Sequence, residues 1–269
     1  MSQSRALTAR LAGSASLLAI LFCGCTSSSE IAGLLDASQA ESTASAAHTN
    51  AAVSALALEA ALREIDMANF APLESPLAVS ATGTSTAGTV TIDFGAGSDV
   101  NNATVAGTVM AAYTVTGNSV SITVTPSGLT TSTQSGGTMT LTGATTVTAT
   151  LNGTSNIAGA ITGTMTATSV SDTVTITPNL TYAIDGTPTT GDITLDGTIG
   201  ILSTRYGDWT ATLTAINATI SQATRAINSG TLVMDRNFIL PITATLVFTG
   251  SNVGTIDVNP SGYTRSFSL

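Results

Sequence analysis

The chain of 269 residues contains no lysine, one histidine and two cysteines. Aromatic residues make up 4% of it and charged residues 9%, and the net charge is −9. A chain with seven arginines against 16 acidic residues cannot neutralise a phosphate backbone, which excludes nucleic-acid binding. Two cysteines are too few for a fold held by disulfides. The apolar content of 43% is too high for disorder driven by charge.

The lack of lysine and the single histidine exclude most catalytic mechanisms. A Ser–His or Cys–His pair needs an imidazole base, and His48 is the only histidine. A Ser–Lys dyad needs lysine, and a zinc site built on histidines needs more than one. The sequence therefore predicts a protein that is not an enzyme and that holds no metal or cofactor.

Residues 1–24 are typical of a signal peptide. Arg5 and Arg10 are the only charges before Glu30, and an apolar run of about a dozen residues follows them. That run is too short to cross a hydrocarbon layer of ~30 Å. It ends in Leu21-Phe22-Cys23-Gly24-Cys25, followed by Thr26-Ser27-Ser28-Ser29.

These residues resemble the signal peptide of bacterial lipoproteins, in which small residues precede a cysteine that becomes lipidated. The resemblance implies that Cys25 is the first residue of the mature protein and carries the acyl chains that anchor it in a membrane. Thr26 stands where Asp would favour retention at the inner membrane, so the resemblance implies the outer membrane of a bacterial cell envelope. Secretory cleavage nearby and an uncleaved anchor are the alternatives. After cleavage, five arginines face 16 acidic residues, a side-chain charge of −11.

A short tether at 25–30 leads to a segment, 31–71, that is rich in Ala, Leu and Glu. Val53, Leu56 and Ala60 share one helical face, and Glu59 and Arg63 form a favourable i, i+4 pair. We expect this segment to be helical and to pack against another part of the protein.

From residue 77 to 269 the composition changes to Thr, Val, Ile and Gly, which favour strands and turns. Threonine makes up roughly a fifth of the whole chain, far above ordinary usage. Apolar and polar residues alternate, as typical of strands with one buried and one solvated face. The alternation is clearest in three segments: Val120, Ile122 and Val124; Ile193 and Leu195; and Ala211, Leu213 and Ala215.

Turn signals separate these segments at Gly117-Asn118, Pro126-Ser127-Gly128, Asp196-Gly197 and Pro260-Ser261-Gly262. Short turns imply antiparallel pairing. We therefore predict a mainly β fold of about a dozen antiparallel strands after an N-terminal helical segment. Either a β-sandwich or a curled, barrel-like sheet satisfies this count.

One weak internal repeat relates residues 88–94 to residues 254–258. The β region resembles Thr/Gly-rich bacterial lipoproteins of unknown function, through residues 89–95 and 255–258, and the likeness implies no activity.

A cluster of unusual residues suggests a recognition patch, because Trp, Tyr and Arg are enriched at binding hot spots. It consists of Arg205, Tyr206, Asp208, Trp209 and Arg236. The alternative is an Arg–Asp pair with an aromatic plug that closes one end of the β core.

Three other patterns have simpler structural interpretations. Paired carboxylates hydrolyse glycosides, but most of the aspartates adjoin turn residues. Gly95-Ala96-Gly97-Ser98-Asp99 matches part of a calcium-binding repeat that works in stacked copies, whereas here there is one copy, which favours a plain turn. The Thr-x-Thr spacing resembles that of ice-binding surfaces, but irregular turn spacing favours a solvated sheet face.

Three hypotheses for function follow. The first is a lipid-anchored envelope protein with a binding, adhesive or structural role and a protein or glycan partner. The second is a carrier that holds a hydrophobic ligand in a curled sheet. The third is an outer-membrane β-barrel, favoured by the alternation of Tyr263, Phe267 and Leu269 at the C-terminus but opposed by the small number of aromatic residues.

Overall fold

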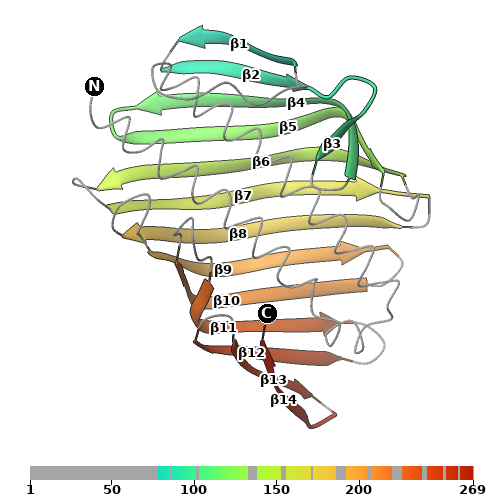
Figure 1. Ribbon diagram of the computed structural model, residues 1–269, viewed down its shortest axis with the longest axis vertical. Helices are drawn as coiled ribbons and strands as arrows, with labels where there is room; N and C mark the ends of the chain where they lie inside the picture. Colours follow the sequence, from blue (N-terminus) through green and yellow to red (C-terminus); the bar gives the residue numbers. More distant parts are fainter. Residues whose placement is uncertain are drawn as a thin grey trace.

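The computed structural model describes residues 78–84, 86–100, 103–132, 138–152, 156–170, 172–185, 192–204, 207–219, 226–237, 241–250, 253–259 and 261–268. The helix expected at 31–71, Cys25 and His48 lie outside these residues. The described residues form strands (Figure 1), which are β1 (Ala78–Thr84), β2 (Ala87–Asp93), β3 (Ser98–Val100), β4 (Ala103–Thr116), β5 (Ser119–Ser132), β6 (Thr138–Asn152), β7 (Asn156–Thr168), β8 (Thr173–Asp185), β9 (Asp192–Ser203), β10 (Gly207–Thr219), β11 (Ala226–Asn237), β12 (Ile242–Gly250), β13 (Val253–Asn259) and β14 (Tyr263–Ser268).

All of these strands belong to one antiparallel sheet. Its order is β1-β2-β4-β5-β6-β7-β8-β9-β10-β11-β12-β13-β14, and the short β3 pairs only with β4. Apart from β3, each strand therefore lies beside its neighbours in the chain, as short connections dictate. The predicted mainly β, antiparallel fold is confirmed. The sequence left open a β-sandwich or a curled, barrel-like sheet. The described residues form one curved sheet that does not close into a barrel.

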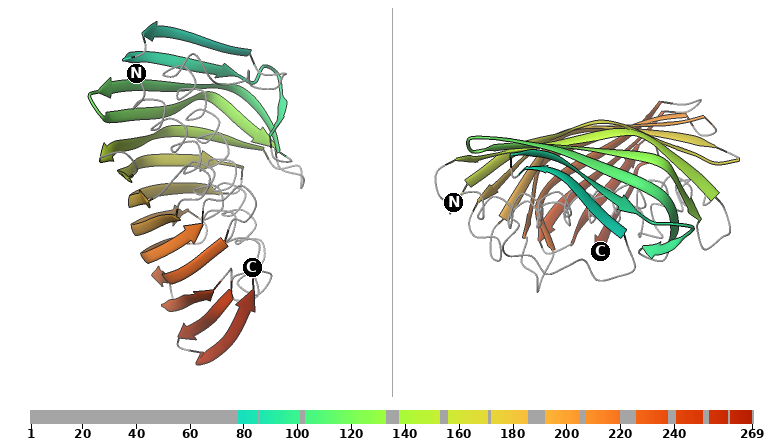
Figure 2. Two further views of the ribbon diagram at one scale, coloured as in Figure 1. Left: turned by 60° about the vertical axis from the view of Figure 1, so that its left-hand side comes forward. Right: turned by 90° about the horizontal axis from the view of Figure 1, so that it is seen from above.

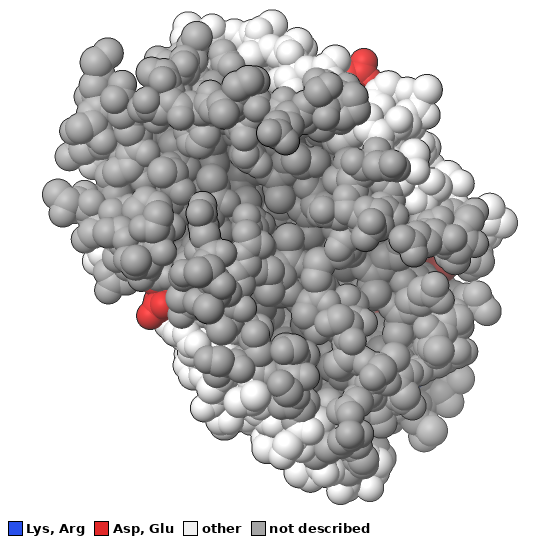
Figure 3. Space-filling model, in the orientation of Figure 1, with Lys and Arg blue, Asp and Glu red and all other residues white. Residues whose placement is uncertain are grey.

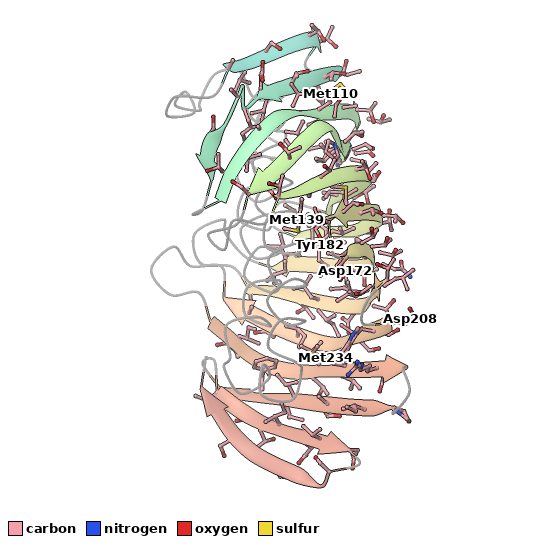
Figure 4. All side chains as sticks on the ribbon, turned by 90° about the vertical axis from the view of Figure 1, so that its right-hand side faces the viewer. Met110, Met139, Asp172, Tyr182, Asp208 and Met234 are labelled. Atoms are coloured by element: carbon pink, nitrogen blue, oxygen red, sulfur yellow. The ribbon has the colours of Figure 1, made fainter. Side chains whose placement is uncertain are left out.

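The two faces of the sheet differ in chemistry. On one face, side chains such as Ile122, Ile161 and Leu195 are almost fully buried, and together with their neighbours they form one continuous core. We call this the apolar face. The other face, which we call the polar face, carries mainly Thr and Ser. In Figure 4, Asp208 projects on the outer side of the sheet, whereas Met139, Tyr182 and Met234 lie toward the other side.

Two predicted turns prove to be bends inside long strands. Pro126-Ser127-Gly128 lies within β5, where the pairing with β6 shifts between Val124 and Leu129. Asp196-Gly197 lies within β9. The turn at Gly117-Asn118 is confirmed between β4 and β5. In this sheet, residues that favour turns bend long strands, and these bends contribute to the strong curvature of the sheet.

The curvature of the sheet is visible in Figure 2. Gly143 in β6 and Gly163 in β7 show how the sequence permits it. Both have positive φ, 104° and 133°, and a Cβ on either would lie within 2.3 Å of a carbonyl oxygen on the adjacent strand. Only glycine allows this conformation and this approach.

A bulge also shifts the alternation in β10. The sequence places Ala215 on the same face as Leu213, but Ala215 is exposed and has a φ of 48°. The pairing with β9 shifts between Leu213 and Ile216, so that Ile216 takes the buried position. The Asp196 carboxylate accepts a hydrogen bond of 2.7 Å from the Ala215 N–H and holds the bulge in place.

Two tyrosines on the apolar face each cover a glycine on the neighbouring strand. The Tyr182 hydroxyl of β8 crosses Gly159 of β7 and donates to the carbonyl oxygen of Thr148 in β6, at 2.9 Å. The Tyr113 hydroxyl of β4 crosses Gly88 of β2 in the same way. It donates to the carbonyl oxygen of Thr84 in β1, at 2.7 Å. Each ring thereby ties three strands together.

We expect Tyr182→Phe to lower the free energy of unfolding by about 1 kcal/mol at pH 7, because it removes one buried hydrogen bond. Burial raises the pKa of Tyr182 above its ordinary value. The tyrosine of the unfolded chain ionises near pH 10, whereas the buried one stays protonated, so this group destabilises the fold as the pH rises above about 10. Urea unfolding between pH 7 and 11 should therefore show a steeper alkaline loss of stability in the wild type than in Tyr182→Phe. Equal slopes would contradict the role of Tyr182.

No helix among the described residues is long and apolar enough to cross a membrane.

Candidate functional site

The polar face carries a row of paired residues that runs across the whole sheet, and nine of its 13 members are threonines. Residue pairs connect it from strand to strand, from Thr82 in β1 to Thr264 in β14. We call this row the threonine rung. Its members are Thr82, Thr89, Ala112, Thr123, Thr146, Thr162, Asn179, Thr198, Thr212, Val233, Thr245, Asp257 and Thr264.

Hydrogen bonds between side chains on neighbouring strands hold this face in order. The hydroxyls of Thr123 and Thr146 lie 3.0 Å apart within the threonine rung. Outside the rung, the hydroxyls of Ser119 and Thr150 are separated by 2.9 Å and those of Thr166 and Thr175 by 3.2 Å. Because threonine is β-branched, its χ1 is already restricted. The face is therefore a stiff array of hydroxyl and methyl groups, with strands spaced by ~4.8 Å.

The charges on the polar face are of one sign. The charged residues of the described strands whose side chains share this face are Asp93, Asp192, Asp196, Asp208, Asp235 and Asp257. An acidic face repels anionic partners and suits hydrogen bonding to neutral or cationic ones. Figure 3 views the molecule from the opposite side, and the described residues that are visible around its margin are mostly uncharged.

Several of these aspartates are used locally. The Asp235 carboxylate accepts a hydrogen bond from the Thr243 hydroxyl at 2.6 Å. Asp257 accepts one from the Thr264 hydroxyl, and Asp93 accepts one from the Gly95 N–H at 2.8 Å. These acids thus support neighbouring strands and turns.

The structure divides the predicted recognition patch between the two faces. Trp209 of β10 and Arg236 of β11 are direct pairing partners on the apolar face, where Trp209 is 9% exposed. The Arg236 guanidinium carbon lies 5.2 Å from the centroid of the Trp209 ring, within range of a cation–π interaction. Asp208 is exposed and belongs to the polar face, while Arg205 and Tyr206 lie outside the described residues.

The sequence does not predict a buried carboxylate that lies at the same end of the sheet as Asp208. Asp172, 5% exposed, precedes β8 and accepts hydrogen bonds from Ser203 at 2.7 Å and from Thr204 at 2.9 Å. The Thr204 hydroxyl in turn accepts the Thr173 N–H at 3.0 Å. The cluster therefore fastens the start of β8 to the end of β9. Its members are 31 and 32 residues apart in the chain, so no local motif reveals them.

We expect Asp172→Ala to lower the free energy of unfolding by about 3 kcal/mol, because it leaves the hydroxyls of the buried Ser203 and of Thr204 without their charged acceptor. Asp208→Ala, an exposed aspartate at the same end of the sheet, is the control and should change stability by less than about 0.5 kcal/mol. Chemical denaturation followed by circular dichroism measures both. Similar effects of the two variants would contradict a structural role of Asp172.

The segment with the partial calcium motif forms a turn followed by β3. The Gly97 N–H and the Ser98 hydroxyl both donate to the carbonyl oxygen of Phe94, at 3.3 and 3.0 Å. Asp99 pairs with Thr104 of β4. Within the described part of the chain, no group of three or more His, Cys, Asp or Glu residues is arranged to hold a metal ion.

The repeat-like segments occupy related places in the fold. Residues 88–94 include most of β2 and residues 254–258 lie in β13, and each of these strands is the second from an edge of the sheet. Comparison of the chain with protein-family models, with curated proteins and with solved structures gave no match.

Proposed function

We propose that this protein is a lipid-anchored, non-enzymatic component of the bacterial cell envelope, attached through Cys25, whose polar sheet face binds a neighbouring envelope component. The single observation that carries the proposal is the threonine rung, which lines up side chains from strands that span residues 78–268. Solubility alone requires polar residues on this face but does not require threonine at nine of the 13 paired positions of one row. An extended, stiff face of this kind suits contact with an extended partner.

The chemistry of the chain supports binding rather than catalysis. The face offers hydroxyls and aspartates, and several of the aspartates are already engaged by hydroxyls or backbone N–H groups. The whole chain contains a single histidine and no lysine. Because the charges on the face are acidic, the partner we propose is neutral and rich in hydroxyl groups, or cationic. The threonine that follows Cys25 supports anchoring in the outer membrane.

Charge substitutions on the polar face test the binding role. In the full-length protein, Thr162→Glu and Thr181→Glu add negative charges at two exposed positions of β7 and β8. Val170→Glu adds one at an exposed residue in the connection between β7 and β8, outside both strands, and serves as control. After detergent removes the membrane, we expect the wild type and the control to sediment with insoluble envelope material and the double variant to be released. Equal retention of all three would refute binding through this face.

Mass spectrometry of the mature N-terminus tests the anchor. We expect the N-terminal peptide to begin at Cys25 and to carry acyl chains, and the Cys25→Ser variant to lose both the acylation and the membrane attachment. An N-terminus elsewhere without acyl groups would refute the anchor and leave the test of the polar face standing.

One observation favours the carrier as a second candidate. Arg236 is a cation on the apolar face, where its guanidinium lies over the Trp209 ring at one end of the sheet. In the carrier hypothesis, an amphiphile would place an acidic headgroup beside Arg236 and its apolar part along the same face. Native mass spectrometry of the purified full-length protein would show such a ligand as a constant added mass that is lost in Arg236→Met. A protein of the sequence mass would refute the carrier.

A further inference from the structure

The two edges of the sheet differ in how they are protected. Within the described residues, β1 and β14 each have only one neighbouring strand. Natural proteins protect edge strands with charges, proline, bulges or a covering segment. The sequence of β14 includes Arg265, whereas β1 reads Ala-Val-Ser-Ala-Thr-Gly-Thr, without charge or proline. All seven residues of β1 are exposed.

The apolar face continues onto β1 beyond the buried core. Val79 pairs with Ile92, and Ala81 pairs with Val90. Ile92 and Val90 are each 1% exposed, but Val79 is 43% exposed. An added strand beside β1 would cover Val79 and satisfy the outward backbone groups of the edge.

We propose that β1 is a self-association edge, at which β1 of a second copy pairs antiparallel to it about a twofold axis near Ala81. Ala81 is the central residue of the strand, so such pairing uses its full length. Because β1 is uncharged, self-pairing places no like charges opposite each other. A twofold axis normal to the sheet keeps both apolar faces on the same side, which makes one sheet continuous across two protein molecules.

The contact is small. Seven residues per strand bury far less than the roughly 1,600 Å² of a standard stable interface. The dimer is therefore weak in solution, and it becomes populated only when the protein is concentrated. A second copy is favoured over an unrelated strand because the exposed edge is complementary to itself along its whole length.

A cysteine at the twofold axis tests this arrangement. The full chain carries Cys23→Ser and Cys25→Ser, so that an introduced thiol is the only one. Directly opposed residues have Cβ atoms about 5 Å apart, within reach of a disulfide after slight adjustment. We expect Ala81→Cys to form disulfide-linked dimers under mild oxidation roughly tenfold faster than Ser266→Cys on the β14 edge.

A charged variant provides the independent control. Ala81→Lys places two like charges at the axis and needs no oxidation. Sedimentation velocity of the same full chain at rising concentration should show weak dimers that are lost in Ala81→Lys, while circular dichroism shows that this exposed edge variant stays folded. Equal crosslinking at the two edges, faster crosslinking at β14, or dimers that persist in Ala81→Lys would each overturn the proposal.

Discussion

Replacing Gly159 by alanine should destabilise the protein by about 3 kcal/mol or more, although only one methyl group is added. A Cβ at this position of β7 would lie 2.1 Å from the carbonyl oxygen of Thr148 and 2.4 Å from the ring of Tyr182. The first of these is backbone in the adjacent strand, and the second is a buried ring whose hydroxyl bonds to the same carbonyl. To relieve the overlap with the added methyl group, either the β6–β7 pairing must open or the Tyr182 hydrogen bond must break.

Gly200→Ala is the matched control for this prediction. A Cβ at Gly200 in β9 would meet only Thr177, at 3.8 Å, which is ordinary van der Waals contact. Urea unfolding of both variants should show a large loss of stability for Gly159→Ala and a change within about 0.5 kcal/mol for Gly200→Ala. Equal stability of the two would show that Tyr182 does not lie over Gly159 as described.

Deleting residues 31–71 should prevent the β region from folding to a soluble, cooperative state. A sheet with one apolar face needs a second layer to cover that face, and the described residues supply a single layer. The sequence predicts helical residues with apolar stripes in 31–71, for example Leu58, Leu62 and Ile65. Without a cover, the continuous apolar face would meet water and lead to aggregation.

Deletion of residues 26–30 is the control, because this short polar tether has no apolar stripe. We expect it to leave the unfolding transition unchanged, whereas the longer deletion yields aggregated protein or a broad, non-cooperative transition in calorimetry. A cooperative transition of unchanged midpoint after removal of 31–71 would show that this segment contributes nothing to the apolar face.

The alternation of residues was enough to predict the strands and their faces. Val120, Ile122 and Val124 were assigned to one face, and all three are buried. The count of strands and their antiparallel pairing also followed, because short connections leave little choice. The sequence pattern could not predict whether the strands form two sheets or one. Period-two alternation shows that one face of a strand is buried, but it does not show which layer covers that face.

Two predicted turns lie inside strands for a physical reason. Pro126-Ser127-Gly128 and Asp196-Gly197 have the chemistry of turns, but in strands of 14 and 12 residues the same chemistry creates bulges. Proline, glycine and aspartate alone do not distinguish a reversal of the chain from a kink. The shift at Ala215 has the same origin.

The candidate site was predictable only in part. The sequence drew attention to Trp209 and Arg236 through their rarity, and the register brings them together. Adjacency in the sequence predicts that Asp208 joins them, yet neighbouring residues of a strand point to opposite faces. The threonine rung depends on the pairing register of many strands, and the Asp172 cluster depends on the pairing of β8 with β9, which no local pattern encodes.

Thiol accessibility in the native envelope tests most directly whether the polar face binds a partner. Single cysteines would replace Thr162 on the polar face and Ile161 on the apolar face of β7, in the full chain with Cys25 kept for the anchor. We predict that the cysteine at 162 reacts quickly with a polar maleimide in detergent-extracted protein and is protected in the intact envelope, while the cysteine at 161 reacts slowly in both. Equal reaction rates at position 162 in the envelope and in the extract would contradict the account.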